Sequence, residues 1–432
     1  MVAVTIGDST EEYKLLLDSA ASNTWVMGEG CSTEACGKHN TFGKGDSKTI
    51  KTDPKTFSVT YGTGSVSGTT ASDTLHIGNS LSTSMSFGVA TNVSSEFLSY
   101  PMDGIIGLGR GTTSDGDTSA PLLIDALSSA KLISSKIYGL HLGRASDNKN
   151  DGELNLGDVN KDRFDGDLNW LSASNSDRGF WEVDIADVGF DTKTVGGVTG
   201  KVGIIDTGTS YFFMPPTEAA TLHKLIDGST QDGESFQVPC STTAPVTLKF
   251  GSTTYNMSSA DWVGSKGNSG LCNSKIVGRA TFGSDRWLIG DAFLKNVYTV
   301  FDVDNSKIGF GVKSAGSNDS SSTTSTTSSS TSASPSGSGT SATSTVGTPS
   351  SATTRTSSSS ASPAHDTPTS SSKPSTNPSP PSGSSTSNSP SSASGAASPS
   401  EAAGNSGVHT LNVVSYSASA ASIVLALFAV FL

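Results

Sequence analysis

The segments LLLDSAAS (residues 15–22) and VGIIDTGTS (residues 202–210) carry the strongest structural signal in this chain. Each is an apolar run typical of a buried strand, and each ends in an aspartate followed by small and hydroxyl residues that suit a tight loop. The two aspartates, Asp18 and Asp206, lie 188 residues apart (206 minus 18). Two equivalent loops could bring two carboxyl groups together so that they share one proton, which is the chemistry of acid-activated water.

The length and patterning of the chain predict two folded lobes. Its 432 residues exceed what one hydrophobic core usually supports, and the last quarter is too poor in apolar residues to fold. Before that quarter, Gly is abundant, and Val, Ile, Thr and Phe recur in short alternating runs with turn signals about every ten residues. We expect a mostly β protein with an N-terminal lobe at residues 1–150 and a C-terminal lobe at residues 151–314.

The charge of the chain disfavours one class of partner. The formal net charge is −12, and residues 319–432 contribute only −1 of it, with three acidic and two basic residues. Neutralising phosphates needs clustered Lys and Arg, so we expect no nucleic-acid partner. An acidic surface is also typical of a protein that works at low pH, where repulsion between carboxylates fades.

Four cysteines, all in the part expected to fold, predict disulfide bonds. Three pairings are possible, and the local one, which keeps one bridge in each lobe, is favoured. A zinc site is the competing interpretation, but the spacing of histidines and cysteines does not favour it. Disulfides indicate an oxidising compartment. The favoured pairs are Cys31 with Cys36 and Cys240 with Cys272.

The C-terminal part of the chain predicts a tether. Residues 315–404 are nearly all Ser, Thr, Pro, Ala and Gly, which is typical of a disordered, O-glycosylated stalk or a plain linker. Small residues, a polar spacer and an apolar tail follow at 405–432, as in a GPI-attachment signal with Asn405 as the attachment site. A tail-anchored transmembrane helix is the alternative. We expect a cell-surface protein of the secretory pathway, held to the membrane by a lipid anchor.

Two further features of the sequence concern the secretory pathway. Asn92, Asn256 and Asn318 each begin an Asn-x-Ser triplet that is an acceptor for N-glycosylation. Met1 leads directly into the strand-like segment VAVTIG (residues 2–7), where a secreted protein has a charged region and an apolar core. We therefore expect a signal peptide, and any pro-segment, to lie upstream of this sequence.

The chain lacks the sequence motifs of several other catalytic mechanisms. The chain has no His-Glu-x-x-His and no Gly-x-Ser-x-Gly. The run YGTGSVSG (residues 61–68) lacks the spacing of a dinucleotide-binding loop and predicts a hairpin tip, with positive φ at Gly62 and Gly64. We expect no metal site and no cofactor.

Five motifs in order resemble the pepsin-like aspartic proteases, most closely their fungal GPI-anchored, yapsin-like members. The resemblance covers about residues 3–313. It rests on DSAASNTWV (18–26), YGTG (61–64), DGIIGLG (103–109), DTGTS (206–210), and WLIGDAFL (287–294) with VFD (300–302) after it.

This resemblance implies a monomeric, bilobal β fold with a cleft between two related β lobes. Asp18 and Asp206 would hold a water in the cleft, one carboxylate as general base and the other as proton donor. The hydroxyl residues after them, Ser19 and Thr207, would brace the two loops against each other. The implied activity is endopeptidase cleavage of peptides or proteins at acidic pH.

The resemblance also implies how a peptide would be held. Tyr61 would close over the peptide as part of a flap and hydrogen-bond Trp25. Backbone groups would hold the peptide as an added extended strand, which gives affinity without strict sequence demand. These groups belong to Gly62, Thr63, Gly208 and Thr209.

The first motif departs from the family pattern, and two rival functions remain open. Ala20 and Ala21 stand where the family usually has Gly and Ser. A methyl group at Ala20 would crowd the water or strain the backbone, and the missing hydroxyl at Ala21 would raise the pKa of Asp18. One rival is therefore a pseudo-protease that binds peptides without cleaving them. The other is an adhesion or structural module in which the stalk and anchor are the functional parts.

Overall fold

The structure is a computed structural model, and it describes residues 1–78, 80–111, 120–176 and 178–314. The predicted stalk, the anchor signal with Asn405 and the acceptor Asn318 lie outside the described residues. All described residues belong to one compact unit.

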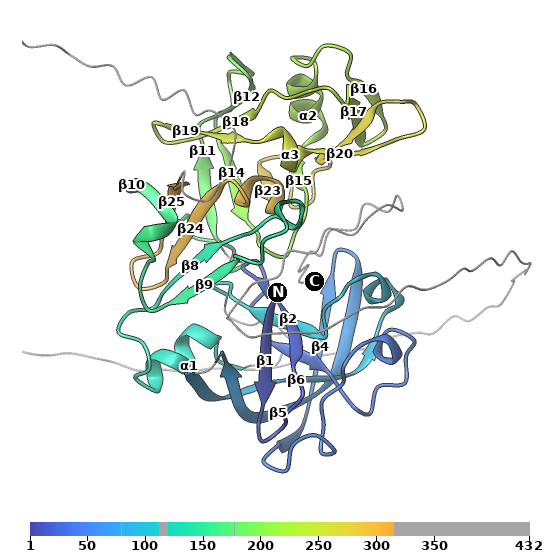
Figure 1. The fold of residues 1–432 in the computed structure, drawn as a ribbon, viewed down its shortest axis with the longest axis vertical. Helices are drawn as coiled ribbons and strands as arrows, with labels where there is room; N and C mark the ends of the chain where they lie inside the picture. Colours follow the sequence, from blue (N-terminus) through green and yellow to red (C-terminus); the bar gives the residue numbers. More distant parts are fainter. Residues whose placement is uncertain (79, 112–119, 177, 315–432) are drawn as a thin grey trace, which may run out of the picture. The chain divides into compact units, whose positions relative to one another are not determined.

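The N-terminal part forms a seven-stranded sheet with the order β1-β2-β7-β3-β6-β5-β4, seen in blue to cyan in Figure 1. Hydrophobic alternation positions its strands: in β1, Val2, Val4 and Ile6 are buried while Ala3 between them is exposed. The strands are β1 (Val2–Ile6), β2 (Tyr13–Asp18), β3 (Trp25–Met27), β4 (Lys51–Tyr61), β5 (Gly64–Ile77), β6 (Leu81–Val93) and β7 (Gly104–Gly107).

The C-terminal part contains a five-stranded sheet with the order β11-β14-β23-β15-β22. Its central strands are short and apolar, which is typical of strands buried on both faces. The strands are β11 (Glu182–Ile185), β14 (Lys201–Ile205), β15 (Phe212–Met214), β22 (Ile276–Gly278) and β23 (Arg286–Ile289).

The two sheets repeat one pattern of strand pairing. In the first, β2 pairs in parallel with β7, β7 antiparallel with β3, and β3 in parallel with β6. In the second, β14 pairs in parallel with β23, β23 antiparallel with β15, and β15 in parallel with β22. Asp18 ends β2 and Asp206 follows β14, so the two aspartates occupy equivalent positions. The predicted relation between two β lobes is confirmed.

A third sheet, with the order β10-β25-β24-β8-β9, takes strands from both sides of residue 150 and so connects the two halves. Its strands are β8 (Ile137–His141), β9 (Glu153–Leu156), β10 (Phe164–Ser172), β24 (Val297–Asp302) and β25 (Lys307–Lys313).

Smaller elements complete the described chain. One four-stranded sheet contains β12 (Asp187–Phe190), β13 (Lys193–Thr194), β18 (Val246–Phe250) and β19 (Thr253–Met257), and another contains β16 (Thr230–Asp232), β17 (Ser235–Val238), β20 (Val263–Lys266) and β21 (Cys272–Ser274). The α-helices are α1 (Leu123–Ser129), α2 (Pro216–His223), α3 (Ser259–Trp262) and α4 (Asp291–Leu294). Short 3₁₀ turns lie at Cys36–Lys38, Ser95–Ser99, Ala145–Asp147 and Lys161–Arg163.

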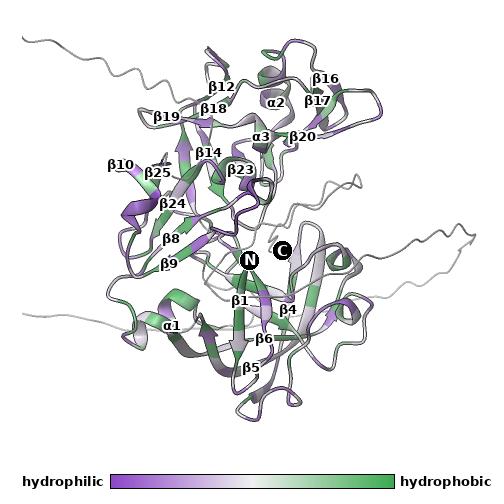
Figure 2. Ribbon diagram, in the orientation of Figure 1, coloured by the Kyte–Doolittle hydropathy of each residue, from purple (hydrophilic) through white to green (hydrophobic). Residues whose placement is uncertain are grey.

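Large aromatic side chains fill the core. Four tryptophans, Trp25, Trp181, Trp262 and Trp287, are fully buried. In Figure 2 the hydrophobic colour alternates with the hydrophilic colour along the strands, as expected where one face of a sheet packs inward. The core therefore forms from the alternation visible in the sequence.

The predicted disulfide pairing is confirmed. Cys31 bonds Cys36 with an S–S distance of 2.02 Å, and Cys240 bonds Cys272 at 2.04 Å. One bridge thus closes a short loop in the N-terminal part, and the other joins β21 to the residues after β17 in the C-terminal part.

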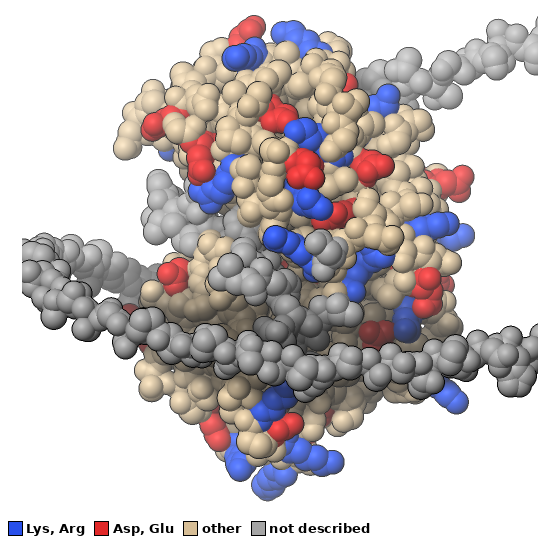
Figure 3. Space-filling model, turned by 180° about the vertical axis from the view of Figure 1, so that it is seen from behind, with Lys and Arg blue, Asp and Glu red and all other residues tan. Residues whose placement is uncertain are grey.

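The surface and the helices give three further observations. Figure 3 shows acidic and basic side chains interspersed on one face, with wide uncharged areas between them. Among the residues that the structure describes, no helix is long and apolar enough to cross a membrane. In the same described ranges, no three His, Cys, Asp or Glu side chains are grouped as a metal site would require.

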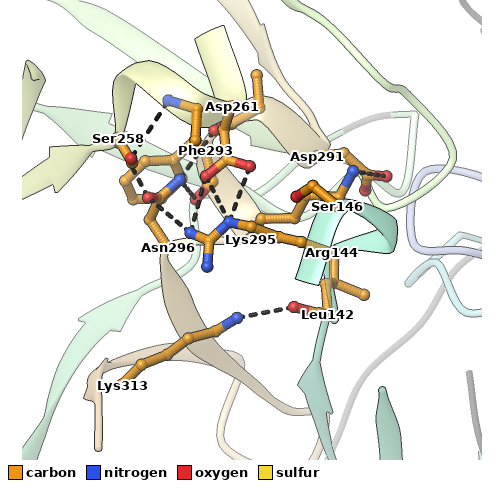
Figure 4. Close-up of polar contacts among 12 residues, drawn as sticks. Leu142, Arg144, Ser146, Ser258, Asp261, Asp291, Phe293, Lys295, Asn296 and Lys313 are labelled. Carbon is orange, nitrogen blue, oxygen red and sulfur yellow. Dashed lines mark hydrogen bonds and ion pairs between the residues drawn. The ribbon is translucent and has the colours of Figure 1, made fainter. Parts of the chain in front are cut away.

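A buried ion pair fastens the connecting sheet to the C-terminal half (Figure 4). Arg144, which follows β8, donates from Nε to both carboxylate oxygens of Asp261 at 3.0 and 2.9 Å. It also donates from a terminal nitrogen to Asp261 at 2.8 Å and to the side-chain oxygen of Asn296 at 3.1 Å. Arg144 is 8% exposed and Asp261 is 4% exposed. Removing Asp261 would take away the carboxylate to which the buried guanidinium donates three hydrogen bonds.

Asp261→Ala is expected to lower the free energy of unfolding by about 3 to 5 kcal/mol, because the guanidinium loses its carboxylate in a buried site. Urea unfolding of wild type and variant measures the change. Glu234→Ala is the matched control, since Glu234 pairs with Arg279 on the surface and its loss should cost less than about 1 kcal/mol. Equal effects of the two substitutions would contradict the assigned role of the Arg144 pair.

Candidate active site

The two aspartates meet at the ends of equivalent strands. Asp18 is the last residue of β2, and Asp206 directly follows β14. Each is 1% exposed, and the two carboxyl groups lie close enough for each to shift the pKa of the other. The structure therefore brings together the side chains that the repeated loop motif singled out.

The residues after the aspartates lock the two loops together. Ser19 donates from its hydroxyl to the carbonyl oxygen of Ile205 at 2.7 Å, and Thr207 donates from its hydroxyl to the carbonyl oxygen of Leu17 at 2.7 Å. Each hydroxyl also accepts from the backbone N–H of the other residue, at 3.1 and 3.0 Å. Four reciprocal bonds between the halves thus fix the separation of the carboxyl groups.

Each carboxylate also accepts hydrogen bonds from its own loop, and the donor groups differ between the two loops. Asp18 accepts from the backbone N–H groups of Ala20 and Ala21 through Oδ1, at 2.9 and 3.0 Å. Asp206 accepts from the backbone N–H of Gly208 at 2.8 Å through Oδ1 and from the hydroxyl of Thr209 through Oδ2. The second donor to Asp18 is therefore the backbone N–H of Ala21, whereas the second donor to Asp206 is the side-chain hydroxyl of Thr209.

Burial and mutual repulsion set the protonation of the pair. Burial raises the pKa of Asp18, while the N–H groups of Ala20 and Ala21 and the bond from Asp206 oppose the rise. The pKa of Asp206 is raised further, because burial and then the charge of Asp18 both disfavour its ionised form. The environment favours an ionised Asp18 that accepts a hydrogen bond from a protonated Asp206, although the pair titrates as a unit.

Ala20 is accommodated without strain, so the expectation of backbone strain is wrong. Its φ is not positive. It packs in an apolar cluster contributed otherwise by the C-terminal half, where Phe180, Ile204 and Phe213 are members. The methyl group therefore adds a contact between the halves at a position where the family pattern has none.

The hairpin of β4 and β5 holds the predicted flap residues. Tyr61 ends β4 and is 2% exposed, and its hydroxyl lies 2.6 Å from Nε1 of Trp25, which donates to it. Gly62 and Thr63 form the turn. The sequence predicts positive φ at Gly62 and Gly64. Only Gly64 has a positive φ, at 157°, and the turn forms without one at Gly62. We call this hairpin the flap.

Two residues near the site were missed by sequence reasoning. Phe97 packs edge-on against Trp25 and Tyr61, with ring centroids 5.6 and 6.0 Å apart. The carbonyl oxygen of Leu108 accepts from the hydroxyl of Tyr138 and from Nε1 of Trp181. Leu108 belongs to the motif DGIIGLG, but the residue type does not reveal that its backbone carbonyl accepts two hydrogen bonds. Phe97 lies outside all five motifs.

The comparison with protein families agrees with this geometry. The family model described as eukaryotic aspartyl protease matches residues 1–313. The chain belongs to the eukaryotic aspartyl protease family. This aspartyl protease is 42% identical over 313 residues to the aspartic-type endopeptidase ctsD of Aspergillus fumigatus, a match that covers 72% of the chain and 65% of the relative.

The aspartyl protease is also similar to another fungal protein and to an animal pepsin. The probable aspartic-type endopeptidase CTSD of Trichophyton verrucosum is 41% identical over 322 residues, covering 74% of this chain and 62% of the relative. Pepsin A of Bos taurus is 29% identical over 313 residues, covering 71% and 82%. The chain thus spans less than two thirds of the length of the two fungal relatives.

Reverting the first loop of this aspartyl protease is expected to have modest effects. Ala21→Ser adds a hydroxyl donor near Asp18 and should lower its pKa, which moves the acidic limb of the pH profile to lower pH. Ala20→Gly removes the methyl contact and adds backbone freedom, so it should lower the free energy of unfolding by about 1 kcal/mol and change kcat/KM by less than about threefold. Peptide cleavage and thermal unfolding measure both effects.

The double variant separates the two interpretations of the first loop. If wild type is inactive and Ala20→Gly with Ala21→Ser creates cleavage, the native loop is the defect and the pseudo-protease interpretation holds. Comparable cleavage by both proteins supports a loop that works as it stands.

Proposed function

We propose that this protein is an aspartic endopeptidase that hydrolyses peptide bonds at acidic pH through a water held by Asp18 and Asp206. The observation that carries the proposal is the meeting of two buried carboxyl groups, delivered by equivalent strands whose loops are bonded to each other. The names of the relatives, aspartic-type endopeptidases and pepsins, support the same reaction.

In the proposed mechanism the two carboxyl groups act in opposite senses. Ionised Asp18 takes a proton from the water, whose oxygen attacks the carbonyl carbon of the peptide bond. Protonated Asp206 donates its proton to the carbonyl oxygen, so that a neutral gem-diol forms. Asp18 then returns its proton to the leaving nitrogen as the C–N bond breaks, and Asp206 takes a proton back from a gem-diol hydroxyl. The hydroxyls of Ser19 and Thr207 keep both groups in position.

The substrate class follows from the groups around the pair. A peptide in extended form would pair with the backbone of Gly62 and Thr63 on the flap and of Gly208 and Thr209 beside Asp206. Recognition through backbone groups needs no particular side chain, which suits an enzyme that cleaves within protein chains. Tyr61 would close over the bound peptide while Trp25 holds its hydroxyl.

Cleavage of an unfolded protein at about pH 3 to 6 tests the proposal. Fragments identified by mass spectrometry should carry new termini within the chain, with no added metal or cofactor. A peptide whose scissile bond is replaced by a hydroxyl-bearing tetrahedral carbon should inhibit, because it resembles the gem-diol. Absence of cleavage across this range would defeat the proposal.

We also propose the organisation and location expected from the sequence: a monomer with lobes at 1–150 and 151–314, a stalk at 315–404 and a GPI signal at 405–432, held at the cell surface. The apolar tail after Asn405 and the Ser- and Thr-rich composition before it support the anchor. Treating cells with a phospholipase specific for phosphatidylinositol should release the protein. Retention on the membrane would contradict the lipid anchor.

A further inference from the structure

The flap tip is docked on the turn that follows β6. Ser65 and Ser94 are joined by two hydrogen bonds: the N–H of Ser65 donates to the hydroxyl of Ser94 at 2.9 Å, and the N–H of Ser94 donates to the carbonyl of Ser65 at 3.0 Å. Any Cβ at Gly64 would lie 3.0 Å from the ring of Phe97. The end of the flap therefore rests on the 3₁₀ turn Ser95–Ser99, and Tyr100 follows this turn directly.

Two buried hydroxyl groups lie at this contact. Thr63 Oγ1 and the Tyr100 hydroxyl are both buried, and neither reaches full hydrogen-bond geometry with any partner among the described residues. They lie close together all the same: burial raises the pKa of Tyr100, and the neighbouring Thr63 hydroxyl opposes the rise. Unpaired buried hydroxyls are costly, so a small closing movement of the flap that completes this bond would be favourable.

The ring of Tyr100 is positioned by its neighbours. It packs edge-on against Phe97 with centroids 6.1 Å apart, and Phe97 in turn contacts Tyr61 and Trp25. Aromatic contacts thus connect Tyr100 to Tyr61, whose hydroxyl accepts a hydrogen bond from Trp25. A shift at Tyr100 would reach the flap at two points, Thr63 and Tyr61.

His39 fixes the backbone of Tyr100. Its Nε2 lies 2.6 Å from the carbonyl oxygen of Tyr100, and its Nδ1 lies 2.7 Å from the carbonyl oxygen of Ala35. Carbonyl oxygens only accept hydrogen bonds, so both contacts are satisfied only when both ring nitrogens carry a proton. The observed geometry therefore fits a ring that donates from both nitrogens.

The charged groups around His39 leave this bonding pattern intact. Lys14, Lys38 and Asp103 line the same surface hollow as His39 and Tyr100. The carboxylate of Asp103 is occupied by the backbone N–H groups of Lys14 and Asn40, at 2.7 and 2.9 Å. The imidazole therefore bonds two carbonyl oxygens, and its protonation decides whether both bonds exist.

We propose that Tyr100 is a positioning residue for the flap: its hydroxyl holds Thr63 when the flap closes over a peptide, and the doubly protonated ring of His39 holds Tyr100 in place. The inference rests on the proposed peptidase function for its purpose, because the flap is useful only if a peptide is enclosed. The contacts themselves do not depend on catalysis.

A double-mutant cycle tests the pairing of the two hydroxyls. Tyr100→Phe and Thr63→Val each remove one hydroxyl and keep the shape, and each should raise KM by about 3- to 10-fold with kcat changed less than about twofold. The combined variant should show the effect of one substitution, because the second has no bond left to break. Tyr13→Phe, which removes another buried hydroxyl of the same sheet, is the control and should leave KM unchanged. Additive effects, or changes below about twofold, would overturn the proposal.

Hydrogen exchange gives a readout that does not need activity. At about pH 4.5, amides of residues 58–67 should exchange at least about threefold faster in Tyr100→Phe and in His39→Gln than in wild type, while amides of β2 stay unchanged. Unaltered flap exchange in both variants would overturn the proposal even if wild type cleaves peptides. If wild type does not cleave, the exchange result alone decides.

Discussion

Asp206→Asn is expected to lower kcat/KM by about 10³- to 10⁴-fold. The amide keeps the shape of the carboxyl group and still reaches Gly208 and Thr209, but it cannot give up a proton to the carbonyl oxygen of the substrate. Initial rates of cleavage of one peptide by wild type and variant measure the loss. Asp291→Asn is the matched control, because Asp291 also has a pKa raised by burial but lies outside the pair; its kcat/KM should change by less than about threefold. Equal losses at both positions would point to a structural effect.

The same substitution has a consequence for stability that needs no substrate. Because the folded pKa of Asp206 is raised above the unfolded value near 3.9, the native state binds more protons between the two values. The free energy of unfolding must then fall as the pH rises through this interval. Asp206→Asn removes the group whose deprotonation causes this decrease. The free energy of unfolding of the variant should therefore fall less than that of wild type between about pH 4 and about pH 7. Urea unfolding at the two pH values checks the sign.

Gly208→Ala is expected to abolish most activity, by about 100-fold or more. A Cβ at position 208 would lie 2.6 Å from both Cγ and Oδ2 of Asp18, closer than nonbonded atoms approach. Either the carboxyl group or the loop must move, and a displacement of about 1 Å in a catalytic group is enough for a loss of this size. Cleavage rate and circular dichroism together distinguish a displaced site from an unfolded protein.

Ala20 provides the matched comparison for that prediction. It occupies the equivalent position in the first loop, already carries a methyl group, and packs it among side chains of the C-terminal half. The two loops therefore have opposite steric tolerance, and Ala20→Gly should be nearly silent where Gly208→Ala is severe. Similar rates for the two variants would contradict this asymmetry.

Much of the fold was predictable because the decisive information is repeated. An apolar run that ends in an aspartate occurs twice, and each occurrence became a strand whose end lies at the same point of an equivalent sheet. The favoured disulfide pairing, with one bridge in each lobe, was also correct. These features depend on short segments, where residue type and geometry are closely linked.

Other features of the site depend on tertiary contacts and could not be predicted. Whether Ala20 is strained depends on the cluster of Phe180 and Phe213, far along the chain. The role of Phe97 depends on Trp25 and Tyr61 meeting it from two different strands. Single residues of ordinary type acquire such roles only in the folded chain.

The central claim is that Asp18 and Asp206 share one proton and act together. The pH dependence of kcat/KM for an uncharged peptide tests it most directly, because kcat/KM reports the ionisation of the free enzyme. The account predicts a bell-shaped dependence of kcat/KM on pH. Activity appears as Asp18 ionises and disappears as the pH rises through the raised pKa of Asp206, when the shared proton is lost. A rate that keeps rising into the alkaline range, or a profile unchanged by Asp206→Asn, would contradict the account.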